Sequence, residues 1–382
     1  MKFEAIAVCL FGVESTVSYE LKNLGFTVTN VSDGRVTFET DSKGLATANI
    51  SLRCAERVLV KIGEFQARSF EELFSNVKKL PLEKYIPSDA KFPVAKAKSI
   101  NSKLFSVSDI QAITKKAAVE RLKTVYNTEW FPETGSTHPL HVFINKDVVQ
   151  LTIDTTGPAL HKRGYRELSG GAPIRETIAA FMVMLTPWNE SKLLIDPMCG
   201  SGTIAIEAAM IGANIMPGIN RNFQGEELSF ISKDDWIQAR KEAIEKENQK
   251  EFKIYAYDID PEMVKLAKSN AELAGVDHLI DFMKSDARKF HSTNEYGFII
   301  TNPPYGERMG EKEAVYELYK DLGRVFRRIP TWSVYIISSL ENVEELFEKK
   351  AAKKRKLYNG MLKSYYYQFP GPKPPRASAE SN

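Results

Sequence analysis

The chain has 382 residues, of which 43% are hydrophobic and 26% charged, a composition typical of a globular protein with two or three domains. Its longest uncharged apolar stretch, residues 178–185, is far too short to cross a bilayer, and its three widely spaced cysteines favour a reducing cytoplasm over a disulfide framework or a metal site. The net charge is +3, but residues 349–382 carry nine Lys or Arg against one Asp or Glu, which indicates either a polyanionic partner or a solvated basic run.

The N-terminal part of the chain predicts two small α+β units. Residues 1–65 show the order strand, helix, strand, strand, helix, strand, with a hairpin signal at "SDG", and this order is typical of a split βαβ sandwich. The next unit follows from helical periods and β-branched runs: a helix over 69–80, a strand near 91–99, a long helix over 106–126 and two strands over 138–147 and 148–156.

From about residue 166 the pattern changes. Continuous apolar runs alternate with helical segments, which implies a parallel sheet covered by helices on both faces. The last two runs flank "NGML" and predict an antiparallel hairpin at the end of this sheet. Residues 371–382 are rich in Pro and Ser and predict a disordered tail.

Polar residues follow successive strands of the predicted sheet, where open α/β sheets bind their ligands. Asp196 ends the first strand, and the glycines of residues 199–202 predict a tight turn into a helix, where backbone can approach a ligand. Asp258 is placed for ribose hydroxyls, whereas Asp260 is expected to cap the following helix. Asp286 could accept a hydrogen bond from an adenine amino group, although a plain turn is the simpler interpretation of that residue alone.

The fourth strand end is "TNPPYGER", residues 301–308, directly after an apolar run. Prolines cannot donate to a sheet ladder, so the strand ends there in a stiff turn. This turn could hold Asn302 and Tyr305 against a flat ligand, or it could be an ordinary strand exit.

Taken in order, "DPMCGSGT", "YAYDIDP", "SDAR" and "NPPYGER" resemble the class I S-adenosylmethionine-dependent methyltransferases that act on exocyclic amines. Residues 155–180 resemble the link into the catalytic domain of THUMP-containing RNA methyltransferases. The long spacer between Asp196 and Asp258 resembles that of the bacterial 23S ribosomal RNA guanine-N2-methyltransferases. Some members of that family carry a second fused methyltransferase domain after this point, and the chain ends without one, so the resemblance implies a single activity.

The resemblance implies an α/β protein with ferredoxin-like and THUMP modules before a Rossmann-like methyltransferase domain. The implied boundaries are residues 1–65 for the ferredoxin-like module, 66–165 (or from near 45) for the RNA-binding THUMP module, 166–370 for the methyltransferase domain and 371–382 for the tail.

The resemblance also assigns roles to individual residues. The amine-binding residues are implied to be Asn302, Pro303, Pro304 and Tyr305. The residues implied to bind S-adenosylmethionine are Asp196, Pro197, Gly200, Ser201, Gly202, Thr203, Asp258, Ile259, Asp286, Ala287 and Asn302. Contacts with RNA, which the resemblance implies to be 23S ribosomal RNA, are expected from Lys162, Arg163, Tyr165, Arg166 and Arg308.

Alternatives stay open from the sequence alone. A tRNA guanine-N2-methyltransferase of the same architecture, an adenine-N6 nucleic-acid methyltransferase and a non-catalytic RNA-binding assembly factor share some of these features. Cys199 could be a nucleophile, but its place in the glycine turn favours packing. Arg163 and Arg166 could belong to a plain basic linker, and Arg308 could pair with Glu311 or Glu313. The sequence does not determine the oligomeric state.

Overall fold

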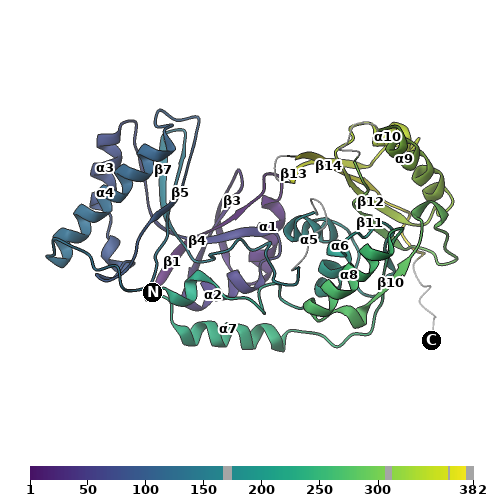
Figure 1. Ribbon diagram of the computed structural model, residues 1–382, viewed down its shortest axis with the longest axis horizontal. Helices are drawn as coiled ribbons and strands as arrows, with labels where there is room; N and C mark the ends of the chain where they lie inside the picture. Colours follow the sequence, from purple (N-terminus) through teal and green to yellow (C-terminus); the bar gives the residue numbers. More distant parts are fainter. Residues whose placement is uncertain (167–173, 306–311, 360–361, 376–382) are drawn as a thin grey trace. The chain divides into compact units, whose positions relative to one another are not determined.

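The computed structural model describes residues 1–166, 174–305, 312–359 and 362–375 (Figure 1). Arg308, an expected RNA contact, and residues 376–382 of the expected disordered tail lie outside the described residues. The chain divides into two compact units. Unit 1 holds Met1–Cys9, Val17–Leu160 and Gly218–Glu245, and unit 2 holds Leu10–Thr16, His161–Pro217 and Lys246–Asn382.

Unit 1 is built on a seven-stranded sheet with the order β2-β3-β1-β4-β7-β6-β5. Its first six elements follow the predicted order of strands and helices, and the second group follows the predicted helix, strand, helix, strand, strand. The elements are β1 (Lys2–Cys9), α1 (Glu14–Asn23), β2 (Thr27–Ser32), β3 (Arg35–Asp41), α2 (Ser42–Ser51), β4 (Ala55–Gln66), α3 (Phe70–Lys79), β5 (Val94–Ile100), α4 (Val107–Tyr126), β6 (Leu140–Asn145) and β7 (Val148–Asp154).

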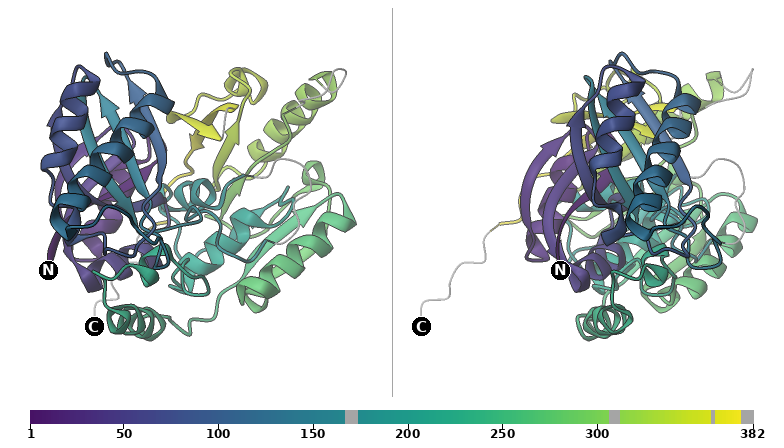
Figure 2. Two further views of the ribbon diagram at one scale, coloured as in Figure 1. Left: turned by 60° about the vertical axis from the view of Figure 1, so that its left-hand side comes forward. Right: turned by 90° about the vertical axis from the view of Figure 1, so that its left-hand side faces the viewer.

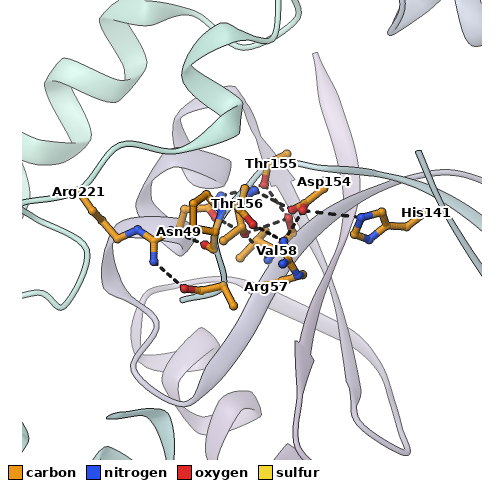
Figure 3. Close-up of polar contacts among 11 residues, drawn as sticks. Asn49, Arg57, Val58, His141, Asp154, Thr155, Thr156 and Arg221 are labelled. Atoms are coloured by element: carbon orange, nitrogen blue, oxygen red, sulfur yellow. Dashed lines mark hydrogen bonds and ion pairs between the residues drawn. The ribbon is translucent and has the colours of Figure 1, made fainter. Parts of the chain in front are cut away.

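The structure joins the two predicted α+β units into one sheet through strand β4. Its first half pairs antiparallel with β1 and its second half pairs antiparallel with β7, and the register shifts between Lys61 and Gly63. A buried polar seam supports this junction (Figure 3). Asn49 on α2 donates to the Thr155 hydroxyl at 2.9 Å and accepts from the Thr156 hydroxyl at 2.7 Å, and both hydroxyls also contact the backbone of Val58. One strand therefore serves both modules.

The middle of the spacer between Asp196 and Asp258, residues Gly218–Glu245, belongs to unit 1. It contains α7 (Lys233–Glu245), which packs side by side with α2 (Figure 1, Figure 2). The chain enters unit 1 at Gly218, whose backbone N–H donates to the Ile50 carbonyl at 2.8 Å. A Cβ on Gly218 would lie 2.8 Å from the Ile50 Cα. Only glycine allows so close an approach. Unit 1 thus incorporates a segment from the middle of the methyltransferase part of the sequence.

Unit 2 holds a second seven-stranded sheet with the order β10-β9-β8-β11-β12-β14-β13. Strands β8 to β12 are parallel, and the terminal hairpin pairs antiparallel with β12 through β14, as the sequence predicted. The elements are α5 (Glu176–Met184), β8 (Leu194–Asp196), α6 (Thr203–Gly212), β9 (Ile254–Asp258), α8 (Pro261–Ala274), β10 (Ile280–Lys284), β11 (Phe298–Thr301), α9 (Lys312–Arg327), β12 (Ser333–Ser338), α10 (Val343–Leu346), β13 (Lys353–Asn359) and β14 (Leu362–Phe369).

Helices cover both faces of the second sheet because alternate strand residues are apolar on each side. Tyr367 on β14 belongs to a core shared with α9 and α10, whereas its neighbour Tyr366 points the other way and donates to the Met182 carbonyl on α5 at 2.7 Å. Both rings are fully buried. This three-layer arrangement leaves the carboxyl ends of β8 to β11 at one edge. Within the described ranges, no helix has the length and apolarity needed to cross a membrane.

Candidate cofactor and amine site

The glycine turn after β8 needs both of its glycines. Gly200 has a φ of +52° and Gly202 a φ of +84°, values that favour glycine. Their surroundings differ, because a Cβ on Gly200 would meet nothing within 4 Å, whereas one on Gly202 would lie 3.0 Å from the Cβ of Ala267 on α8. Gly200 therefore faces open space where a ligand can approach, and Gly202 permits close helix packing.

Asp258 at the end of β9 holds this turn in place. Its Oδ2 accepts from the Gly200 N–H at 2.9 Å, and its Oδ1 accepts from the Asp260 N–H at 3.0 Å. Asp260 caps α8 by accepting from the Glu262 N–H at 2.9 Å, which confirms the predicted division of labour for the cap. A carboxylate offers about four acceptor positions, so Asp258 keeps capacity for a ligand hydroxyl.

Asp196 is buried beneath the turn, only 1% exposed. Its Oδ1 accepts from the hydroxyl of Thr301 on β11 at 2.7 Å and from the Met198 N–H at 3.3 Å. Burial raises the pKa of Asp196 to about 7, and the negative charge of Asp258 contributes in the same direction. Asp196 thus ties the ends of β8 and β11 together beneath the turn.

Asp286 follows β10 and begins the short 3-10 helix Ala287–Lys289. Its carboxylate receives the Arg288 Nε at 2.9 Å and Nη2 at 2.6 Å, and these hydrogen bonds hold the pKa of Asp286 below its usual value. Arg288 was not predicted from sequence, although it stands two residues after Asp286 in "SDAR". A ligand amino group would share Asp286 with this arginine.

Asn302 and Tyr305 follow β11, as the "NPPY" motif predicted, and they interact with each other. The Tyr305 hydroxyl donates to the Asn302 Oδ1. Pro303 is buried and Pro304 exposed, so the stiff turn is anchored on one side and open on the other. An amide oxygen has two lone pairs, and this contact uses one of them.

These strand ends enclose a cavity of about 510 Å³, within the usual range for small-molecule sites, with a smaller one of about 130 Å³ beside it. Both cavities are lined by Met198, Gly200 and Asn302. Of the predicted residues, the larger is also lined by Pro197, Asp258, Ile259, Asp286, Ala287 and Pro304, and the smaller by Asp196, Ser201 and Thr203. Gly202, Pro303 and Tyr305 line neither.

Sequence reasoning missed the apolar walls of this site. Ala314 and Leu318 on α9 line the larger cavity, and Ile174 and Met263 line the smaller one. The four-residue spacing of Ala314 and Leu318 places them on one helix face, which is the only sequence signal that could have found them. Apolar walls beside paired carboxylates suit an adenosine, and Gly200 leaves room for its close approach.

Cys199 lines the smaller cavity but is only 7% exposed. Burial raises the pKa of its thiol well above the usual value, and the nearby Asp196 and Asp258 carboxylates raise it further. A nucleophilic cysteine needs the opposite environment, one that favours the thiolate. Packing is therefore the better interpretation of Cys199.

The basic link before the methyltransferase part is mostly turned inward. Arg163 and Tyr165 are each 4% exposed, and both contact Glu207 on α6, at 3.3 Å from the Arg163 Nε and 3.1 Å from the Tyr165 hydroxyl. Arg166 pairs with Glu176 at 3.0 Å, while Lys162 is exposed. This burial favours a structural role over RNA contact for Arg163 and Tyr165, because they clamp the helix that begins at the glycine turn.

Comparison with known proteins identifies the family. Residues 163–368 match the family described as "RMKL-like, methyltransferase domain", residues 4–59 the "RlmL ferredoxin-like domain" and residues 67–154 the "THUMP domain". The chain belongs to the THUMP-domain-containing RNA methyltransferases. This membership confirms the resemblance and the fold that the sequence motifs implied.

Several relatives within this family are similar over nearly the whole chain. "Putative RNA methyltransferase YpsC" of Bacillus subtilis is 47% identical, covering 96% of both chains. "Ribosomal RNA large subunit methyltransferase K/L" of Aliivibrio fischeri is 32% identical over 94% of this chain, which spans only 52% of that relative's length.

Solved structures agree. A predicted N6-adenine-specific DNA methylase from Listeria monocytogenes has a TM-score of 0.92 and 46% identity, covering 97% of both chains. SMU.472, complexed with SAH, has a TM-score of 0.92 and 41% identity, covering 98% of this chain and 99% of its own. This THUMP methyltransferase therefore uses S-adenosylmethionine, and the cavity at the ends of β8 to β11 is its candidate binding site.

Proposed function

We propose that the protein methylates the exocyclic N2 amine of a guanine in 23S ribosomal RNA. The observation that carries this proposal is the position of Asn302, which lines both adjoining cavities and so stands where a cofactor and an amine would meet. The choice of guanine rests on the motifs and the long spacer that resemble the guanine-N2-methyltransferases, and the choice of 23S RNA is supported by the K/L relatives, whose name refers to large-subunit ribosomal RNA.

The chemistry asks for hydrogen-bond acceptors beside the amine. S-adenosylmethionine supplies a methyl group on a positively charged sulfur. The nitrogen of a guanine amine is a weak nucleophile because its lone pair is delocalised into the ring. The Asn302 amide oxygen and the Pro303 carbonyl can accept its two N–H bonds, which makes the nitrogen more electron-rich and aims it. As the N–C bond forms and the C–S bond breaks, the amine becomes acidic and releases a proton to solvent, so a strong base is unnecessary.

Tyr305 supports this arrangement in two ways. Its hydroxyl donates to the Asn302 Oδ1, which orients the amide and leaves the second lone pair of that oxygen for the substrate. Its ring would stack on the base, and stacking contributes roughly 1–3 kcal/mol per base. The rigid prolines between them keep both groups in place, and positioning of this kind can account for much of an enzyme's rate. A paired guanine would first have to be flipped out of its stem.

The proposal assigns the cofactor to the other three strand ends. Asp258 would accept from ribose hydroxyls while it keeps its bonds to the turn, and Asp286 would lie near the adenine. The exposed side chain of Ile259, 58% accessible, offers an apolar surface for that base. The ferredoxin-like and THUMP modules of unit 1 would bind the RNA. A cytoplasmic location would follow from such a substrate.

The decisive experiment is methylation of unmodified ribosomal RNA by the purified protein with labelled S-adenosylmethionine, followed by nucleoside mass spectrometry and mapping of the position. We expect N2-methylguanosine in 23S RNA from the wild type, and only a trace of this product from Asn302→Ala. Asp260→Ala is the matched control, since it removes a polar side chain of the neighbouring helix cap rather than an amine contact.

One rival has an observation in its favour. The Listeria structure, described as a predicted N6-adenine-specific DNA methylase, shares 46% identity, and an adenine amine would meet the same acceptors at Asn302. N6-methyladenosine as the product would overturn the guanine assignment. Methylated tRNA with untouched ribosomal RNA would instead overturn the RNA assignment, and no methyl transfer to any RNA would favour an assembly factor.

A further inference from the structure

Unit 1 contains a cavity of its own, of about 170 Å³, on one face of its sheet. The strand register explains its lining. Val8 on β1 pairs with Arg35 on β3 and with Arg57 on β4, which puts the two arginines in one row across three strands. His141 on β6 pairs with Lys96 on β5, so a second row brings these residues together. The cavity thus spans strands of both the ferredoxin-like and the THUMP modules.

The lining of this cavity is strongly basic. Arg35, Arg57, Lys96 and Lys98 contribute cationic side chains, and Asp33 is the acidic residue that lines it. Arg57 is fixed by an ion pair with Asp154, which also lies 3.8 Å from the His141 Nε2 (Figure 3).

Arg35 is the unusual member of the set. The residue is nine-tenths buried, and its Nε and Nη2 atoms have no hydrogen-bond partner among the described residues. Its guanidinium carbon lies 4.4 Å from the centroid of the Phe143 ring, which also lines the cavity. Buried N–H groups without a hydrogen-bond partner are costly, so the two unpaired nitrogens of Arg35, a residue that lines a cavity, indicate a missing acceptor.

The electrostatics of the neighbours point the same way. Burial lowers the pKa of Arg35 to about 10 and that of His141 to about 3, and the charges of Arg57, Lys96 and Arg35 lower the latter further. The pKa of Lys96 is lowered by partial burial of its side chain and by Arg57 and Lys98, although Asp154 and Glu56 oppose this. Cations crowded together in this way favour an added anion.

We infer that this cavity binds a phosphate group of the RNA backbone. Guanidinium groups match the geometry of phosphate oxygens, and Arg35, which has two nitrogens without a hydrogen-bond partner, lines the cavity beside Arg57. Lys96 and Lys98 are exposed, so they reach the strand on either side of the buried contact. The inference rests on the proposed function only in taking RNA as the substrate. It gives the sheet face of unit 1 a defined anchoring point for RNA, distinct from the site of methyl transfer.

The test compares charge-matched variants of the full-length protein. The double variant Lys96→Gln/Lys98→Gln removes two exposed charges of the cavity. Its control, Lys78→Gln/Lys79→Gln, removes two exposed charges of α3 that do not line it. Binding of a short labelled RNA hairpin is measured by fluorescence anisotropy over a series of salt concentrations. We expect the cavity variant to bind RNA about tenfold more weakly, with little change in the control. The slope of log K against log salt concentration should become about two units shallower in the cavity variant. Equal losses in both variants would overturn the inference.

Arg35 is tested with Arg35→Lys and Arg35→Gln, which keep and remove its charge. If the guanidinium fork binds phosphate, both weaken RNA binding, and lysine restores only part of the affinity. Full affinity in a folded Arg35→Gln would refute its role. Isothermal titration with inorganic pyrophosphate distinguishes a site for a small free anion. If the wild type bound pyrophosphate tightly, and Lys96→Gln/Lys98→Gln abolished this binding but left RNA binding unchanged, the RNA assignment would be refuted.

This binding assay requires no methyl transfer. Weakened RNA binding in the cavity variant would stand even if the product proved to be N6-methyladenosine. Conversely, N2-methylguanosine formation with wild-type RNA affinity in the cavity variant would overturn this inference alone.

Discussion

Replacement of Asp258 by alanine tests how the cofactor site is assembled. The carboxylate accepts from the Gly200 N–H at 2.9 Å and from the Asp260 N–H at 3.0 Å, and it lines the larger cavity. A hydrogen bond to a charged group contributes about 1.5–3 kcal/mol, so loss of one ligand contact alone lowers affinity at least tenfold. Loosening of the turn adds to this loss. We therefore expect Asp258→Ala to weaken S-adenosylmethionine binding by about 10- to 100-fold.

The assay is isothermal titration of S-adenosylmethionine into folded protein, with Asp260→Ala as the control. Asp260 stands two residues away and caps α8 through the Glu262 N–H at 2.9 Å. Loss of such a cap costs about 1 kcal/mol of stability and should leave cofactor affinity within about threefold. Asp258→Asn keeps one acceptor oxygen, so its affinity for S-adenosylmethionine should lie between those of Asp258→Ala and Asp260→Ala. Unchanged affinity in Asp258→Ala, or an equal loss in Asp260→Ala, would refute the assignment.

Variants at three further residues test the remaining groups. Asn302→Ala should lower kcat by about 10²–10³ and change cofactor affinity less, because it removes one preorganised contact to the amine; a uniform loss of both would argue against this role. Tyr305→Phe should be mild and Tyr305→Ala severe in a methylation assay if stacking dominates, and equal effects would count against stacking. Burial raises the pKa of Asp196 to about 7 in the folded protein, against about 3.9 in the unfolded chain. The protonated carboxyl therefore stabilises the fold fully below about pH 4, and ~4 kcal/mol of unfolding free energy is lost as the pH rises through 7. Urea unfolding at pH 5 and pH 8 should therefore show a smaller decline for Asp196→Asn than for the wild type.

Local sequence signals determined most of the elements and much of the site. Apolar runs, glycines and prolines act within a few residues, so they located the strands, the cap at Asp260 and the turn at Gly200 before any contact was known. The order of strand ends then brought Asp258 and Asn302 to one edge, because parallel strands joined by helices must align their carboxyl ends. That part of the site follows from topology alone.

The tertiary structure decided the pairings between distant segments. The sequence of β4 does not show that its second half pairs with β7, because any neighbouring strand can satisfy the hydrogen-bonding groups of its backbone. It likewise does not show that residues 218–245 pack within unit 1, or that α9 supplies apolar walls to the cavity.

Charged residues were the least predictable from sequence. Arg163 looks like a surface cation in the sequence and is buried against Glu207, 44 positions away, while Arg35 looks like an ordinary residue beside a hairpin turn and is buried in a basic cavity. A charge has no local preference for burial; its position depends on whether the fold brings it a partner, and that partner comes from a distant part of the chain.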